Sequence, residues 1–217
     1  MSSREEVLAR IRAANAAAGY PKPPDVPRDY RRRGEHPPGA PALLELFRDR
    51  LVDYKATVLV ATPDTIPATI ATALAGITGR VVLPPGLPED WWPAKNDDAK
   101  NDDPVFRDGE SHPLSPAELD ASAAVVTACA AACATTGTIA LDGSPDQGRR
   151  ALSLVPDVHV CVVRAEQVVQ TVPELLAALD PRRPITFVSG PSATSDIELE
   201  RVEGVHGPRT LIVVLVR

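Results

Sequence analysis

The chain has 217 residues, a net charge of −6, a hydrophobic fraction of 44% and an aromatic fraction of only 4%. This length suits one domain, or one domain with an appended arm, and a core with so few aromatics is expected to consist of Val, Leu, Ile and Ala, as in a parallel sheet covered by helices. The acidic balance argues against a nucleic-acid partner, and the lack of a long apolar run or a signal sequence predicts a cytoplasmic protein without membrane contacts.

The first 41 residues predict a helix followed by an arm. Ser2 and Glu5 are typical of a helix start, and apolar residues follow them at helical spacing. Residues 20–41 are rich in proline and are expected to form an extended arm. Such an arm could dock on its own core or on a second subunit, so a homo-oligomer is an open alternative. Residues 42–217 are expected to form the main domain.

Short apolar runs and helical patterns alternate through this domain. Strands are expected at 57–61, 80–83, 123–126, 138–141, 158–163, 185–188 and 211–216. Helices are expected at 42–54, 64–76, 129–135 and 172–179. The alternation predicts an α/β fold with a mostly parallel sheet of about six or seven strands, flanked by helices. Neither the dinucleotide fingerprint nor the Walker loop is present.

A threonine-rich turn is the first candidate for anion binding. Thr136, Gly137 and Thr138 are expected where a short helix turns into a strand, with hydroxyl donors beside a glycine that permits close backbone approach. The alternative is an ordinary helix C-cap in which Gly137 takes a left-handed conformation.

Two adjacent arginines follow a Pro-Asp-Gln-Gly turn. Arg149 or Arg150 could hold a carboxylate or a phosphate with its planar guanidinium. Equally, both could cap a helix or pair with Asp142 and Asp146 on the surface.

The segment from Gly190 to Arg209 is the richest in polar groups, and it lies between two runs expected to be buried strands. Residues 195–198 fit a capping box, and a helix N-terminus reached directly from a strand offers free N–H groups to an anion. His206, next to glycine, could meet a ligand or could simply be part of a turn. The candidate ligand-binding residues are therefore Thr136, Gly137, Thr138, Arg149, Gly190, Ser192, Thr194, Ser195, Asp196, His206 and Arg209.

The three cysteines do not indicate a metal site. Cys129 and Cys133 would share a face of the helix expected at 129–135, and Cys161 falls in a strand. Zinc sites and iron–sulfur clusters need more ligands and other spacings, so we expect buried thiols, no metal and no cofactor.

Taken together, these motifs resemble the LUD-domain family, and within it the lactate utilization protein C group. The resemblance covers the chain from about residue 120 to the end and is densest at 136–141, 145–152, 154–157, 190–198 and 204–208. It implies a fold similar to the group formed by ribose-5-phosphate isomerase, glucosamine-phosphate deaminase and the CoA-transferases. Proteins of that group bind phosphorylated or carboxylated ligands at the C-terminal ends of a parallel sheet, which matches the anion-binding cleft expected from the residues above, with 190–209 as one wall and 136–138 as the other.

The function implied by the resemblance is that of a subunit in a three-component system that oxidises L-lactate to pyruvate. Two sister proteins of that system carry the iron–sulfur clusters, and this chain would be the subunit without them. Relatives often have a glutamate where Thr135 stands, which favours binding or assembly over catalysis and leaves no catalytic residue assigned. The alternatives are a free-standing enzyme on a sugar phosphate or CoA ester, with Asp196 or Glu198 as base, and a structural or regulatory module.

Overall fold

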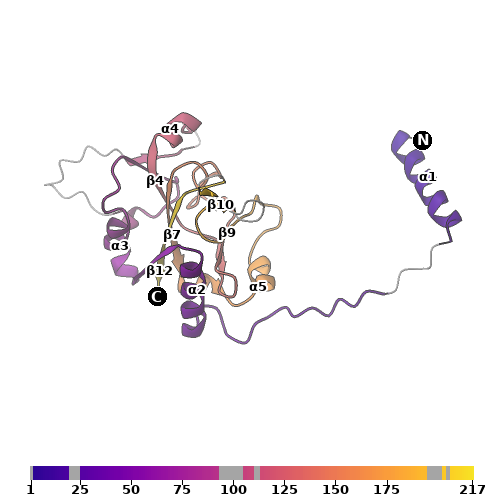
Figure 1. Ribbon diagram of the computed structural model, residues 1–217, viewed down its shortest axis with the longest axis horizontal. Helices are drawn as coiled ribbons and strands as arrows, with labels where there is room; N and C mark the ends of the chain where they lie inside the picture. Colours follow the sequence, from indigo (N-terminus) through magenta and orange to yellow (C-terminus); the bar gives the residue numbers. More distant parts are fainter. Residues whose placement is uncertain (1, 20–24, 93–104, 110–112, 195–201, 204–205) are drawn as a thin grey trace. The chain divides into compact units, whose positions relative to one another are not determined.

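The computed structural model describes residues 2–19, 25–92, 105–109, 113–194, 202–203 and 206–217. The chain divides into two units, Met1–Tyr30 and Arg31–Arg217. In the first unit, helix α1 spans Ser3–Ala17 (Figure 1). The Ser2 Oγ accepts a hydrogen bond from the Glu5 N–H, and the Glu5 carboxylate accepts one from the Ser2 N–H. This reciprocal capping confirms the predicted helix start.

In the second unit, six parallel strands form the main sheet in the order β1-β12-β7-β4-β2-β3. Their bounds are β1 Thr57–Ala61, β2 Arg80–Leu83, β3 Val105–Arg107, β4 Ser122–Thr127, β7 Val158–Arg164 and β12 Thr210–Val216. The predicted α/β class with a parallel sheet is confirmed. The closer grouping with the isomerase, deaminase and CoA-transferase folds stays a prediction.

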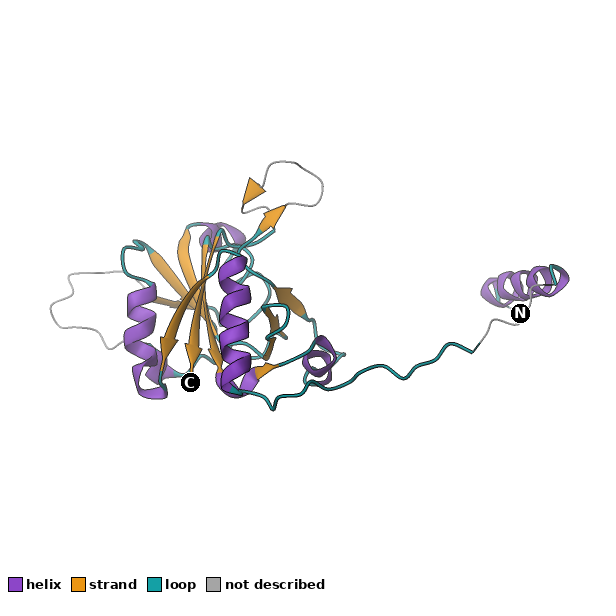
Figure 2. Ribbon diagram, turned by 60° about the horizontal axis from the view of Figure 1, so that its bottom comes forward, coloured by secondary structure: helices purple, strands orange, loops and turns teal. Residues whose placement is uncertain are grey.

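Helices cover both faces of this sheet, and Figure 2 shows its strands between two of them. The helices that pack on it are α2 Pro41–Asp53, α3 Ile66–Ala73 and α4 Pro116–Asp120. Helix α5 (Val172–Ala177) packs instead on Ala131, Cys133 and Ala140, which lie outside this sheet. Phe47 and Leu51 of α2 pack on the face that carries Cys161 and Val163, whereas α3 packs on the face that carries Val160 and its neighbours. Because side chains alternate along a strand, the continuous apolar run of β7 serves both layers. None of the described helices is long and apolar enough to cross a membrane.

A second sheet has the order β8-β5-β6-β9, with bounds Val168–Val169, Ala131–Cys133, Thr138–Leu141 and Thr186–Val188. A short antiparallel pair joins β10 (Ala193–Thr194) to β11 (Val202–Glu203). The helix predicted at 129–135 is wrong, because this alanine-rich stretch forms β5 and pairs with β6 and β8. Helix propensity is a weak preference that sheet pairing overrides.

The strand predicted at 185–188 is also only partly correct. Residues Thr186–Val188 form β9, but Phe187 is 49% exposed, so the strand is not buried. It pairs antiparallel with β6 in the second sheet, whereas β12 lies in the main sheet. The polar segment that begins at Gly190 therefore connects two different sheets.

The strand order creates a crevice at the carboxyl edge of the main sheet. The chain leaves β2 toward β3 on one side, and it leaves the neighbouring β4 toward β7 on the other. Such a reversal between adjacent strands is where open α/β sheets bind ligands. Pro85 follows β2 and Asp108 follows β3 at this edge.

Candidate functional site

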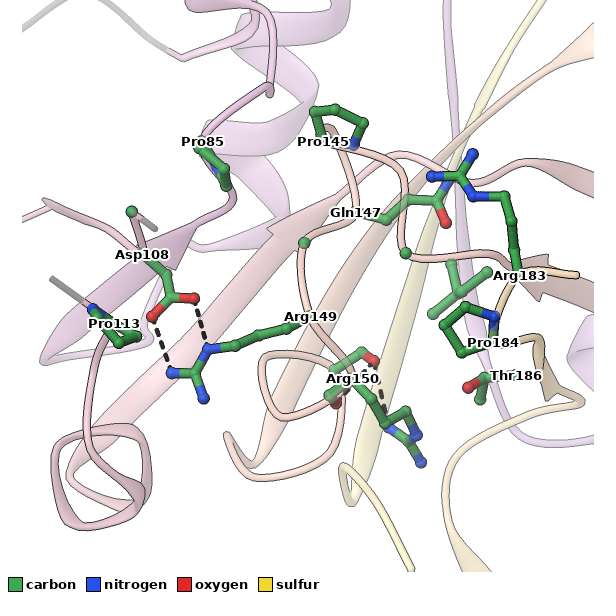
Figure 3. A pocket seen from close by; sticks show the side chains of 15 residues that line it. Pro85, Asp108, Pro113, Pro145, Gln147, Arg149, Arg150, Arg183, Pro184 and Thr186 are labelled. Carbon is green, nitrogen blue, oxygen red and sulfur yellow. Dashed lines mark hydrogen bonds and ion pairs between the residues drawn. The ribbon is translucent and has the colours of Figure 1, made fainter. Parts of the chain in front are cut away.

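A cavity of about 660 Å³ lies at this edge of the sheet. Its lining residues come from the segments that follow β2 and β3, from the last residue of β6, from the long connection between β6 and β7, and from the start of β9 and the residues just before it. Figure 3 shows three arginines around it, Arg149, Arg150 and Arg183. Four prolines also line it, Pro85, Pro113, Pro145 and Pro184, and they make its wall stiff because proline fixes its own backbone angle.

Arg149 forms an ion pair with Asp108 inside the protein. Its Nε and Nη2 atoms donate to the two carboxylate oxygens of Asp108 at 2.7 and 2.8 Å. Burial opposes ionisation of Asp108, but the hydrogen bonds from Arg149 and from the Leu114 N–H outweigh it and lower the pKa of this carboxyl. The pair thereby ties the segment after β3 to the β6–β7 connection, and Arg149 is left with little capacity for a further anion.

Arg183 has a similar arrangement at another part of the cavity. Its Nη1 atom lies 2.8 Å from an Asp142 carboxylate oxygen and 2.9 Å from the Ser144 hydroxyl. The other Asp142 oxygen accepts from the Ser144 hydroxyl at 2.6 Å. This arginine therefore also has its charge compensated within the protein.

Arg150 differs from both. Its Nη1 atom donates to the Ser153 hydroxyl at 3.2 Å, and its Nη2 atom reaches the His206 carbonyl oxygen at 3.5 Å. Within the described ranges, no carboxylate lies at ion-pair distance from it. Part of its side chain is exposed, yet the burial of the rest lowers the pKa of the guanidinium. A partly desolvated cation without a carboxylate is suited to receive an anionic ligand.

A second cavity, of about 220 Å³, shares Arg150 and Ser153 with the first. Its other walls come from β9, from the start of β7 and β12, and from residues 190–192 and 206–208. The Ser192 hydroxyl accepts from the His206 N–H at 2.9 Å, and the Ser192 N–H donates to the Pro208 carbonyl at 2.9 Å. These bonds hold the two short segments together at the cavity.

The predicted ligand-binding residues are only partly brought together. Arg149 lines the larger cavity, and Gly190, Ser192 and His206 line the smaller one. Arg209 lines neither of them and pairs with Asp157 at 3.2 Å. Thr194 lies in β10, where side chains are not described, and Ser195 and Asp196 lie outside the described residues.

The threonine-rich turn lies beside the smaller cavity rather than in its wall. It is a hairpin turn between β5 and β6, not the end of a helix. Gly137 has a φ of 62°, and a Cβ atom at this position would clash with Arg50. The Thr136, Thr138 and Ser189 hydroxyls form a chain with two 2.8 Å separations. Ser189 is the member of this chain that lines the smaller cavity. Any ligand role for the three predicted residues stays a prediction.

Three residues that line the cavities were not among the candidates predicted from the sequence, namely Ser153, His159 and Arg183. His159 and Ser153 are almost fully buried, at 1% and 5% exposed. The sequence signal for His159 was a lone polar residue in the apolar run of β7. In the part of the chain that the structure describes, no three His, Cys, Asp or Glu side chains gather as metal ligands would. The chemistry that this arrangement supports is the binding of an anion at Arg150.

Comparison with known proteins identifies the family. The model of the LUD domain matches residues 116–216. Lactate utilization protein C of Deinococcus radiodurans is 45% identical over 99% of this chain and 97% of that protein, and the protein of that name in Bacillus subtilis is 34% identical over 38% of each chain. The crystal structure of a DUF162 family protein from Deinococcus radiodurans matches 81% of this chain and 97% of that one, with 42% identity and a TM-score of 0.65. The chain therefore belongs to the LUD-domain family.

Proposed function

We propose that the protein acts in lactate utilization as the subunit without iron–sulfur clusters, beside partner proteins that carry them. The support is a relative named lactate utilization protein C that is 45% identical over nearly the whole chain. The second part of the proposal is that the cleft around Arg150 binds a small anion that this system handles.

The proposal of an anion site rests on one observation, the environment of Arg150. Arg149 and Arg183 line the same cleft, but each already has a carboxylate within 2.8 Å. Arg150 has a hydroxyl and a carbonyl oxygen as its partners. An anion that reaches Arg150 would gain a charge-assisted hydrogen bond without first breaking an ion pair to any of the described residues.

The test is a replacement experiment in a host that grows on L-lactate. The chromosomal gene is deleted and replaced by the wild type, by Arg150→Gln or by Arg209→Gln. Arg209 is a matched control because it is an arginine outside both cavities, with an exposed carboxylate partner. We expect the deletion and Arg150→Gln to impair growth on lactate and Arg209→Gln to support it.

Affinity purification from the same strains tests the partners. The wild-type protein and both variants should retain co-purifying proteins with the visible absorbance of iron–sulfur clusters. Normal growth of the deletion strain on lactate would refute the role in lactate utilization. Normal growth of the Arg150→Gln strain would refute the anion site alone.

A second candidate is a free-standing enzyme acting on a sugar phosphate or a CoA ester. The volume of the larger cavity, about 660 Å³, favours it, because pockets for larger organic ligands occupy about 300–1,000 Å³. Thermal unfolding in the presence of phosphosugars, CoA esters, lactate or pyruvate separates the two candidates. Stabilisation by a phosphorylated ligand or CoA ester, with turnover by the isolated protein, would favour this enzyme. Stabilisation by lactate or pyruvate alone would exclude it.

A further inference from the structure

A buried histidine forms part of the wall of the smaller cavity. His159 is the second residue of β7, a strand whose other buried side chains are apolar apart from Cys161, and it is 1% exposed. Polar groups buried at such depth are retained where they have partners. A histidine here therefore needs an explanation that packing alone does not supply.

Thr127 supplies one partner for the ring. Its hydroxyl oxygen lies 2.8 Å from the His159 Nε2 atom, and Thr127 is fully buried on the neighbouring strand β4. The Cys161 side chain, two residues farther along β7, also forms a hydrogen bond with the His159 side chain. Among the described residues, Nε2 is the ring nitrogen with an oxygen partner, which leaves Nδ1 without one. Since His159 lines the smaller cavity, Nδ1 is the ring atom available to a ligand there.

Thr127 also allows the ring to act either as a hydrogen-bond donor or as a hydrogen-bond acceptor toward a ligand. A threonine hydroxyl can donate or accept a hydrogen bond, and a neutral imidazole carries its single proton on either nitrogen. When the Thr127 hydroxyl donates to Nε2, the proton is on Nδ1 and the ring donates to the cavity. When Nε2 carries the proton and donates to Thr127, Nδ1 accepts from the cavity.

We propose that the smaller cavity selects short acids with an oxygen on carbon 2, with Arg150 binding the carboxylate and His159 binding that oxygen. The ring accepts from the hydroxyl of a 2-hydroxy acid and donates to the carbonyl of a 2-oxo acid. The volume of about 220 Å³ lies below the range of pockets for larger ligands and suits a chain of few carbons. The inference rests on the proposed function, since it names the ligand class of the same cleft, and it assigns His159 as a specificity-determining residue.

The test is calorimetric titration of the full-length protein with four small acids. L-Lactate and pyruvate carry the oxygen on carbon 2, propionate has none, and 3-hydroxypropionate carries its hydroxyl one carbon farther away. We expect lactate and pyruvate to bind at least about tenfold more tightly than the other two, because a site built to hydrogen-bond an oxygen discriminates against a ligand that lacks it. Equal affinity for propionate and lactate, or binding of none of the four, would overturn the inference.

Variants assign the two roles. His159→Leu should bring the lactate-to-propionate affinity ratio to about one while leaving propionate binding unchanged, because only the oxygen contact is lost. Arg150→Gln should weaken binding of lactate and pyruvate, and Arg209→Gln should change no affinity. An unchanged affinity ratio in folded His159→Leu would contradict the role of the ring.

His159 is buried, so its variant could fail to fold, and the wild type provides an independent readout. With ¹⁵N-labelled histidine, lactate and pyruvate should shift the His159 ring nitrogen resonances, and propionate should leave them in place. Unmoved resonances in saturating lactate would overturn the inference. This failure is distinguishable from failure of the proposed function, since it would leave the lactate growth defect of the Arg150→Gln strain intact.

Discussion

Replacing Asp108 by asparagine is expected to destabilise the protein substantially. The carboxylate is 5% exposed, accepts two hydrogen bonds from Arg149 and accepts a third from the Leu114 N–H at 2.7 Å. Breaking a fully buried ion pair costs about 3–5 kcal/mol. The Arg149 side chain is 39% exposed, so solvent screening reduces the loss, and we expect about 2–3 kcal/mol.

Thermal unfolding at neutral pH measures this loss. For a protein of this size the expected decrease in Tm is about 4–12 °C, from a change of about 2–4 °C per kcal/mol. Asp157→Asn is the matched control, because Asp157 also pairs with an arginine, at 3.2 Å, but is 60% exposed. Its expected cost is no more than about 1 kcal/mol. Equal Tm decreases in the two variants would refute the assignment of Asp108 as a structural anchor.

The same pair predicts a pH dependence. Burial opposes ionisation of Asp108, but the hydrogen bonds from Arg149 and Leu114 lower its pKa below the ordinary value of 3.8. A lowered pKa means that the stabilisation is present above the unfolded-state value and is lost as the pH falls through the folded-state value. Urea unfolding should therefore show the difference between wild type and Asp108→Asn narrowing below about pH 4. A constant difference down to pH 2 would contradict this assignment.

Two further predictions concern packing. Gly190→Ala should cost about 1–2 kcal/mol more than Gly76→Ala, because the two glycines have φ values of 84° and 82° but only at Gly190 would a Cβ atom lie 2.6 Å from a Tyr54 carbon. Equal costs, measured by urea unfolding, would show that crowding at Tyr54 is unimportant. The three cysteines are free and buried, and a hydrogen bond with Cys161 together with burial raises the pKa of Cys129. Ellman's reagent should therefore titrate all three thiols in urea and none rapidly in the native protein; rapid reaction of one native thiol would contradict the burial.

Five of the six strands of the main sheet were predicted from the sequence because they are short apolar runs rich in β-branched residues, whereas β3 (Val105–Arg107) was not predicted. The runs at 57–61 and 80–83 coincide with β1 and β2, and that at 211–216 lies within β12. The alanine-rich stretch at 129–135 was not accessible in this way. Alanine favours a helix locally, and only the pairing of β5 with β6 and β8 makes it a strand.

The candidate site shows the same limit. The sequence offered Arg149 or Arg150 as the residue that holds an anion and named Arg149 among the candidate residues, although nothing in the local sequence separates it from its neighbour. Arg149 pairs with Asp108, which lies 41 residues earlier in the chain, and Arg150 turns toward Ser153 and His206. A contact over such a separation depends on how β3 and the β6–β7 connection pack together.

The sequence by itself determined the α/β class, the capped N-terminal helix and the resemblance to the LUD-domain family, because these depend on local periodicity, capping and contiguous motifs. Only the tertiary structure decided that the alanine-rich stretch belongs to a second sheet, which arginine already has a carboxylate and that His159 lines a cavity. The physical reason is that burial and ion pairing depend on residues distant in sequence, which only the completed fold brings into contact.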